Sequence, residues 1–258
     1  MDSVYRPPAG PAVADFVERY WSVSWSTDEP RRREVITHPA FHLTVTTGED
    51  ENGRYCRAVV NGVVTRTFAV DLRGRGLVVG AKFRPGGFTA LTGWPAYAFT
   101  DRMVPLPELL TADRVRGLTD AAAAAPDDPD MAVAALDELI TGLVPRRRPA
   151  TYPLVLSVVA DMLADHSLSR VEDVAARHGL SVRTLQRLFR RFVGVGPKWV
   201  LQRYRLHDAV SAIDTDQGVM ADLAGLAASL GWSDQSHFTR DFTAAVGVSP
   251  HAYAARPV

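Results

Sequence analysis

The pattern of apolar and polar residues changes character along the chain. Up to about residue 88, short runs rich in Val, Thr and Phe alternate in part and are separated by turn-forming residues, which is typical of β-strands. From Pro105 onward, apolar residues recur at spacings of three and four, which is typical of amphipathic helices. The pattern predicts an α+β protein.

The amino-terminal region predicts an antiparallel sheet or partial barrel with helices. Residues 15–25 fit a helix or a strand, and the turn at residues 82–88 leads into a short helix ending near Gly93. Asn61-Gly62 predicts a hairpin turn, because this pair favours the left-handed backbone of a two-residue loop. The strand-like runs are residues 34–36, 41–47, 55–60, 63–70 and 76–83.

Two amphipathic helices follow, on either side of the break at residues 126–129. Their apolar stripes would either pack on the sheet or form the surface of a homodimer, and the pattern leaves both open. Residues 144–149, with two prolines and three arginines, predict an exposed linker. We therefore expect an amino-terminal sensing or dimerisation domain at residues 1–145, a linker at 146–150 and a second domain at 151–258.

The carboxy-terminal region begins with a helix, a tight turn and a second helix at residues 171–192. Gly179 can adopt the left-handed conformation that ends a helix, and Ser181 can cap the next one. Residues 167–169 are placed to cap the first of the two. From Ser181 to Arg205 there are seven Lys or Arg and no Asp or Glu. A helix face presenting Arg183, Gln186, Arg187, Arg190 and Arg191 suits the base edges and phosphates of double-stranded DNA.

This unit is repeated. Ala175, Gly179 and Ser181 recur 52 residues later, and Arg187, Phe189, Gly194 and Pro197 recur 53 residues later, so one residue is added inside the second turn. Residues 198–213 between the copies predict a connecting helix. An internal repeat of this kind is a stronger signal than either copy alone.

Residues 181–213 and 223–254 resemble the DNA-binding domain of AraC/XylS-type regulators. The resemblance is carried by Leu185-x-Arg187-x-Phe189, Pro197, Arg205-Leu206-x-x-Ala209, and Gly231-Trp232-Ser233-Asp234-Gln235-Ser236-His237-Phe238-x-Arg240-x-Phe242 through Gly247-x-Ser249-Pro250-x-x-Tyr253. It implies an all-α domain of two helix-turn-helix units, joined by a long helix, that enter successive major grooves. The candidate DNA-binding residues are Ser181, Arg183, Thr184, Gln186, Arg187, Arg190, Arg191, Gln235, Ser236, His237 and Arg240.

The chain departs from that family at two places. Trp232 stands where Phe is usual and should still fill the core, and Thr243-Ala244-Ala245 replaces residues that are often basic. The first 150 residues resemble, less specifically, the amino-terminal domains of some actinobacterial members through Gly80-x-x-Phe83-x-Pro85-Gly86-Gly87. The resemblance implies a transcription regulator. The Asn61-Gly62 hairpin region, Trp21, Trp25 and the turn at residues 83–88 suggest room for a small-molecule effector.

Composition and motifs bear on whether the protein is secreted, membrane-bound or an enzyme. The lone Cys56 cannot form an internal disulfide, there is no long apolar run, and the first residues lack a secretory pattern, so we expect a cytoplasmic protein without a membrane segment. The alternative is a metal-dependent, enzyme-like amino-terminal domain built on Glu34, His38 and His42. We expect no metal, cofactor or catalytic residue, because no third ligand has a compelling spacing and no nucleophile or phosphate-loop motif is present.

Overall fold

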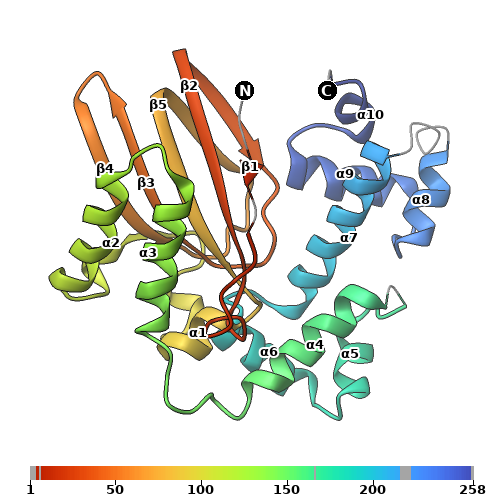
Figure 1. Cartoon of the computed structure of the whole chain (residues 1–258). Helices are drawn as coiled ribbons and strands as arrows, with labels where there is room; N and C mark the ends of the chain where they lie inside the picture. The colour runs from red at the N-terminus through yellow and green to blue at the C-terminus, as the bar shows by residue number, and fades with distance from the viewer. Residues whose placement is uncertain (1–3, 6, 166, 216–221, 257–258) are drawn as a thin grey trace.

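The computed structural model describes residues 4–5, 7–165, 167–215 and 222–256. It confirms an α+β fold, with an antiparallel sheet followed by an all-helical region (Figure 1). Within the described residues the sheet is open rather than a barrel, with the strand order β1-β2-β5-β3-β4-β6. The strands are β1 (Val4–Tyr5), β2 (Val17–Val35), β3 (His42–Asp50), β4 (Gly53–Asn61), β5 (Phe68–Phe83) and β6 (Met103–Pro105).

The hairpin predicted at Asn61-Gly62 is wrong. Asn61 ends β4, which pairs with β3 and β6, whereas β5 pairs with β2 and β3. The Gly62 amide donates to the Arg102 carbonyl at 3.0 Å, and a Cβ on Gly62 would overlap the Phe99 carbonyl oxygen. Glycine is therefore required here for close backbone approach. The hairpin of this region lies at Asp50–Gly53 instead, between β3 and β4.

The bounds of β2 decide two other strand predictions. Residues 15–25, which fitted either a helix or a strand, belong largely to β2, and residues 34–36 are not a separate strand because β2 continues to Val35. The turn at residues 84–86 leads into α1 (Gly87–Thr92), which ends at Gly93 with a φ of 79°. The short helix expected there is confirmed.

The amphipathic helices α2 (Ala112–Ala124) and α3 (Pro129–Thr141) lie across one face of the sheet (Figure 1). Val115, Leu118, Leu136 and Ile140 are buried in the core beneath them. Of the two arrangements that the sequence allowed for these stripes, packing on the sheet is the one observed. Between α1 and α2 the chain forms two short 3-10 helices, η1 (Ala96–Ala98) and η2 (Leu106–Glu108).

The carboxy-terminal region is helical in the order that the sequence predicts. Helices α5 (Val171–Arg177) and α6 (Val182–Phe192) form the first unit, and α8 (Leu223–Ser229) and α9 (Gln235–Val246) form the second. Helix α7 (Pro197–Thr215) joins them. Helix α4 (Tyr152–Ala164) precedes the first unit, and α10 (Pro250–Ala254) follows the second.

The two units belong to different hydrophobic cores. One core runs from the sheet through α1 and α4 to Phe189 and Phe192 of α6, and it ends at Tyr204 of α7. The other begins at Leu206 of the same helix and extends through α8 and α9. Where α4 meets the segment before β2, the ring of Tyr152 stacks on Phe16 and its hydroxyl donates to the Asp15 carbonyl at 2.8 Å. The first unit is therefore packed with the sheet as one body.

Candidate nucleic-acid interface

The turn of the first unit forms as its residue types predict. Gly179 has a φ of 62°, which is the left-handed conformation that glycine adopts without strain. Ser181 caps α6 by accepting from the Thr184 amide at 3.1 Å, and the two hydroxyls lie 2.9 Å apart. The cap predicted from residues 167–169 for α5 is wrong, because Arg170 is the N-cap and makes no side-chain capping bond.

Helix α6 has one buried face and one cationic face. Leu185, Phe189 and Phe192 are buried, and Leu188 packs partly against the same core. The exposed set is Arg183, Gln186, Arg187, Arg190 and Arg191. Among the residues that the structure describes, none of these arginines has an ion-pair partner. The face is therefore free to bind an external anion.

Two of the seven basic residues counted in this segment do not belong to that face. Arg203 is 4% exposed and donates to the Thr65 carbonyl at 3.0 Å, while Arg205 donates to the carbonyls of Ser169 and Gly231. Burial lowers the pKa of both guanidinium groups. Both side chains are bound by backbone carbonyl oxygens, so the charge available to an external anion comes from the other five basic residues of this segment.

The second unit repeats the turn with one more residue. Gly231 has a φ of 84°, and the capping role of Ser181 passes to Asp234, whose carboxylate accepts from the His237 amide at 2.7 Å. The inserted residue explains why the repeat interval changes from 52 to 53. Trp232 is 6% exposed and packs edge-on to Phe238, which confirms that it fills the core.

The predicted DNA-binding residues of α9 differ in their surroundings. Gln235, Ser236 and Arg240 are exposed. His237 is half-buried, with Nδ1 3.1 Å from the Ser233 hydroxyl and Nε2 3.3 Å from the Asp241 carboxylate. Its ring must exchange these partners before it can contact a base. In the first unit, Ser181 and Thr184 are similarly engaged in the cap.

The two units lie at opposite ends of α7 (Figure 1). This helix has 19 residues, which correspond to a length of about 28 Å. Recognition helices that enter successive major grooves are about 34 Å apart. The length of α7 therefore suits two units placed one turn of DNA apart.

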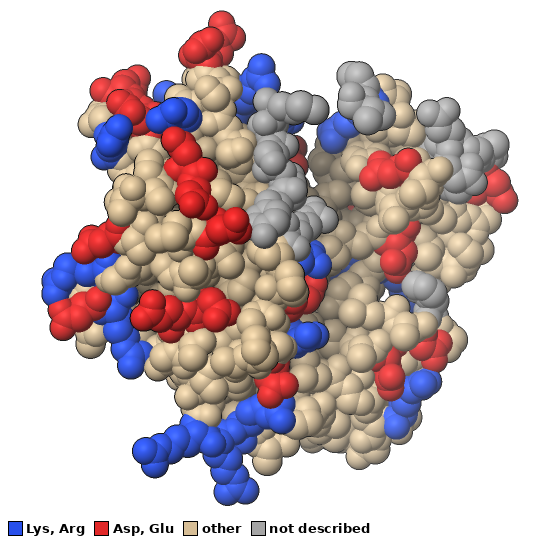
Figure 2. Space-filling model, viewed as in Figure 1, with Lys and Arg blue, Asp and Glu red and all other residues tan. Residues whose placement is uncertain are grey.

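The units differ in charge. Between residues 206 and 242 there is one Arg against six Asp. Figure 2 shows acidic side chains over the second unit, on the face in view. Basic side chains project from the loop between α3 and α4, where Arg146, Arg147 and Arg148 are exposed. Arg148 pairs with Asp15 at 2.8 Å.

The candidate metal ligands of the amino-terminal region have other partners. His42 Nδ1 accepts from the Trp21 indole at 3.0 Å, the ring of His38 stacks on His207 of α7 at 3.8 Å, and Glu34 pairs with Arg32. Within the described ranges, no group of His, Cys, Asp or Glu could hold a metal ion. The free thiol of Cys56 donates to the Thr119 carbonyl, and burial raises its pKa.

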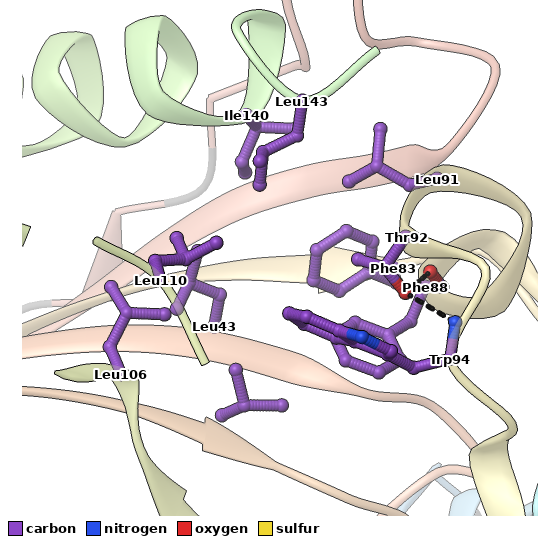
Figure 3. Close-up of a pocket in the computed structure, with 11 residues that line it drawn as sticks. Leu43, Phe83, Phe88, Leu91, Thr92, Trp94, Leu106, Leu110, Ile140 and Leu143 are labelled. Carbon is purple, nitrogen blue, oxygen red and sulfur yellow. Dashed lines mark hydrogen bonds between the residues drawn. The ribbon is translucent and has the colours of Figure 1, made fainter. Parts of the chain in front are cut away.

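A small apolar cavity lies between the sheet, α1 and α3 (Figure 3). Its volume of about 10 Å³ is close to the space of one water molecule. The lining residues are Leu43, Val60, Phe83, Phe88, Leu91, Thr92, Trp94, Leu106, Leu110, Ile140 and Leu143. Trp21 and Trp25 lie elsewhere, with their rings against Gly80 and Gly76 of β5. A larger molecule could enter only if the lining side chains moved.

Two family models match the chain. Residues 5–105 match a domain of unknown function (DUF6597), and residues 174–256 match a helix-turn-helix domain. The second range begins inside α5 and covers the rest of both helix-turn-helix units, and the resemblance to the AraC/XylS type is confirmed there. No helix in the described part of the chain is long and apolar enough to cross a membrane.

Comparison with curated proteins and solved structures gives similar descriptions. The chain is 34% identical over 92 residues to YkgA of Escherichia coli (strain K12), named as a candidate HTH-type transcriptional regulator, and the match covers 36% of this chain and 37% of that protein. An AraC-type transcriptional regulator structure from Chromobacterium violaceum has 22% identity and a TM-score of 0.37, covering 42% of this chain and 97% of that one. ToxT from Vibrio cholerae has 11% identity and a TM-score of 0.44, covering 98% and 97%.

Proposed function

We propose that this chain is a sequence-specific transcription regulator that binds double-stranded DNA through its two helix-turn-helix units. The observation that carries the proposal is the pair of exposed recognition-helix faces at the two ends of α7, one of them lined by arginines without ion-pair partners in the described structure. The family match to a helix-turn-helix domain supports it.

The candidate residues divide by chemistry. We assign Arg183, Gln186 and Arg187 to base edges, since Arg donates two bonds to guanine and Gln pairs with adenine. We assign Arg190 and Arg191, at the carboxy-terminal end of α6, to phosphates. In the second unit, Gln235, Ser236 and Arg240 are the base-contacting candidates, and His237 joins them if its ring leaves Ser233 and Asp241.

The test is to map sites bound by the full-length protein across the genome and to measure binding to a recovered site by fluorescence anisotropy. Arg183→Ala with Arg187→Ala should weaken binding about tenfold or more, since each good base contact contributes about 1 to 3 kcal/mol. Arg114→Ala is the matched control, because Arg114 is exposed on α2. Wild-type protein that binds no duplex at low salt would refute the proposal.

For the amino-terminal domain we propose an effector-sensing role in a cytoplasmic protein. The apolar lining of the cavity in Figure 3 supports a small apolar molecule as the effector class. A homodimer is the second proposal for this domain, and its surface would lie outside the stripes of α2 and α3, which are buried. Thermal-shift screening with small apolar compounds, together with light scattering of the full chain, separates the two roles.

A further inference from the structure

One residue of the amino-terminal region lies against the cationic face of α6. The ring of Tyr97, in η1, lies beneath the guanidinium of Arg190, with 4.8 Å between Cζ and the ring centroid. Tyr97 is 48% exposed although it is large and partly apolar. Its position next to a candidate phosphate-binding arginine is not explained by core packing.

The contact is held by specific bonds between η1, α1 and the end of α6. The Thr100 hydroxyl donates to the Gly194 carbonyl at 2.8 Å, and the Thr89 hydroxyl donates to the Arg191 carbonyl at 3.2 Å. Gly194 has a φ of 96°, and a Cβ there would lie 2.8 Å from the Thr100 hydroxyl and 3.1 Å from the Ala96 carbonyl. The backbone of η1 thus approaches α6 as closely as a glycine allows.

Tyr97 and Arg190 also share a surface cleft. Its volume is about 430 Å³, and its lining includes Tyr97, Gln186, Arg190 and Lys198. Gln186 lies one turn before Arg190 on the same face of α6, and Lys198 adds a second exposed cation at the start of α7. In the described part of the chain, neither cation has an ion-pair partner.

We propose that Tyr97 is a positioning residue in the DNA interface, by which the amino-terminal domain holds Arg190 at the phosphate backbone. This inference rests on the proposed function. A ring beneath a guanidinium covers one face of the group and leaves its N–H edges in the plane free to donate, so stacking and phosphate binding are compatible. It also limits the rotamers of a long side chain, so less conformational entropy is lost when the phosphate binds.

The test uses the full chain and a fluorescein-labelled duplex of unrelated sequence, about 30 base pairs long to span two recognition helices. Phosphate contacts are independent of sequence, so no operator is required. Tyr97→Leu removes the ring and Tyr97→Phe keeps it. Because the ring acts by ordering one long side chain before the phosphate binds, Tyr97→Leu should weaken affinity about two- to fivefold, with Tyr97→Phe close to wild type.

A double-mutant cycle with Arg190→Ala separates positioning from general damage. If Tyr97 acts through Arg190, Tyr97→Leu should have no further effect on affinity once Arg190 is Ala. Equal effects in both backgrounds, no effect of Tyr97→Leu, or tighter binding by Tyr97→Leu would each overturn the proposal. A wild-type protein that binds the duplex, together with an inert Tyr97, would refute only this inference and not the DNA-binding function.

Discussion

The two helix-turn-helix units have the same local structure and different surroundings. In the first, Leu185 and Phe189 are buried in the core of the sheet, and the exposed face is cationic. In the second, Phe238 and Phe242 belong to a separate core, and the neighbouring sequence is acidic. Because phosphate attraction supplies most non-specific affinity, the first unit is suited to anchoring and the second to discrimination. We therefore predict that the two copies of the motif divide the work of binding DNA.

The largest expected effect concerns stability. Phe189→Ala and Phe242→Ala each remove a fully buried ring and should cost about 3 to 5 kcal/mol. Hydrogen exchange measured by mass spectrometry should show that Phe242→Ala lowers protection mainly in residues 206–254. Phe189→Ala should lower it in β3 and β5 as well, since its core includes the sheet. Equal loss of protection in the sheet for both variants would contradict the division into two cores.

The second prediction concerns the division of DNA contacts. Arg187→Ala with Arg190→Ala should weaken binding to every duplex and reduce the slope of log K against log salt by about 0.9, because Arg190 is the proposed phosphate contact. Specificity should fall as well, because Arg187 is the proposed base contact.

Arg240→Ala is the matching change in the second unit. It should cost about 1 to 3 kcal/mol at one half-site while the other half stays protected in footprinting. Loss of protection over both halves, together with full affinity of the first-unit variant, would reverse the assignment of anchoring and discrimination.

The sequence accounts for the repeat better than for the relation between its copies. Gly179, Gly231 and the core position of Trp232 could be predicted because turns and helix faces are local. The carbonyl contacts of Arg203 and Arg205 could not be predicted, because their partners lie on Thr65, Ser169 and Gly231, which no periodicity connects to them. Strand pairing is also long-range. Asn61-Gly62 has the residue types of a hairpin turn, but β4, which ends at Asn61, pairs with β6 and not with the strand that follows it. Tyr97 carried no signal of its own.

The third prediction uses the histidines between the sheet and α7. Burial lowers the pKa of His38 and of His42 to about 3, with nearby Lys82 and Arg19 adding to the effect, and His207 is shifted in the same direction. The unfolded chain binds protons below about pH 6.5 and the folded chain does not until about pH 3, so stability falls as the pH decreases through that window. The loss from pH 7 to pH 6 should be on the order of 1 kcal/mol.

Melting temperatures across this range check the histidine prediction. His38→Gln should flatten the dependence on pH, whereas His251→Gln should not, because His251 is exposed. An unchanged slope for His38→Gln would mean that this ring is not a source of the pH dependence.

The smallest expected effect concerns the threonines that join the sheet region to each unit. Thr100 donates to the Gly194 carbonyl after α6, and Thr67 donates to the Ala245 carbonyl near the end of α9 at 3.1 Å. Valine keeps the shape of threonine and removes the donor, so each substitution should cost about 0.5 to 1.5 kcal/mol. The first unit shares its core with the sheet, so Thr100→Val should lower the free energy of global unfolding. The second unit has its own core, so Thr67→Val should instead speed amide hydrogen exchange at the end of α9 and change the free energy of global unfolding little. Thr111→Val is the control, since the Thr111 side chain makes no capping bond. Urea unfolding and site-resolved exchange distinguish these outcomes. If Thr67→Val lowered the free energy of global unfolding as much as Thr100→Val, the second unit would be joined to the sheet as firmly as the first.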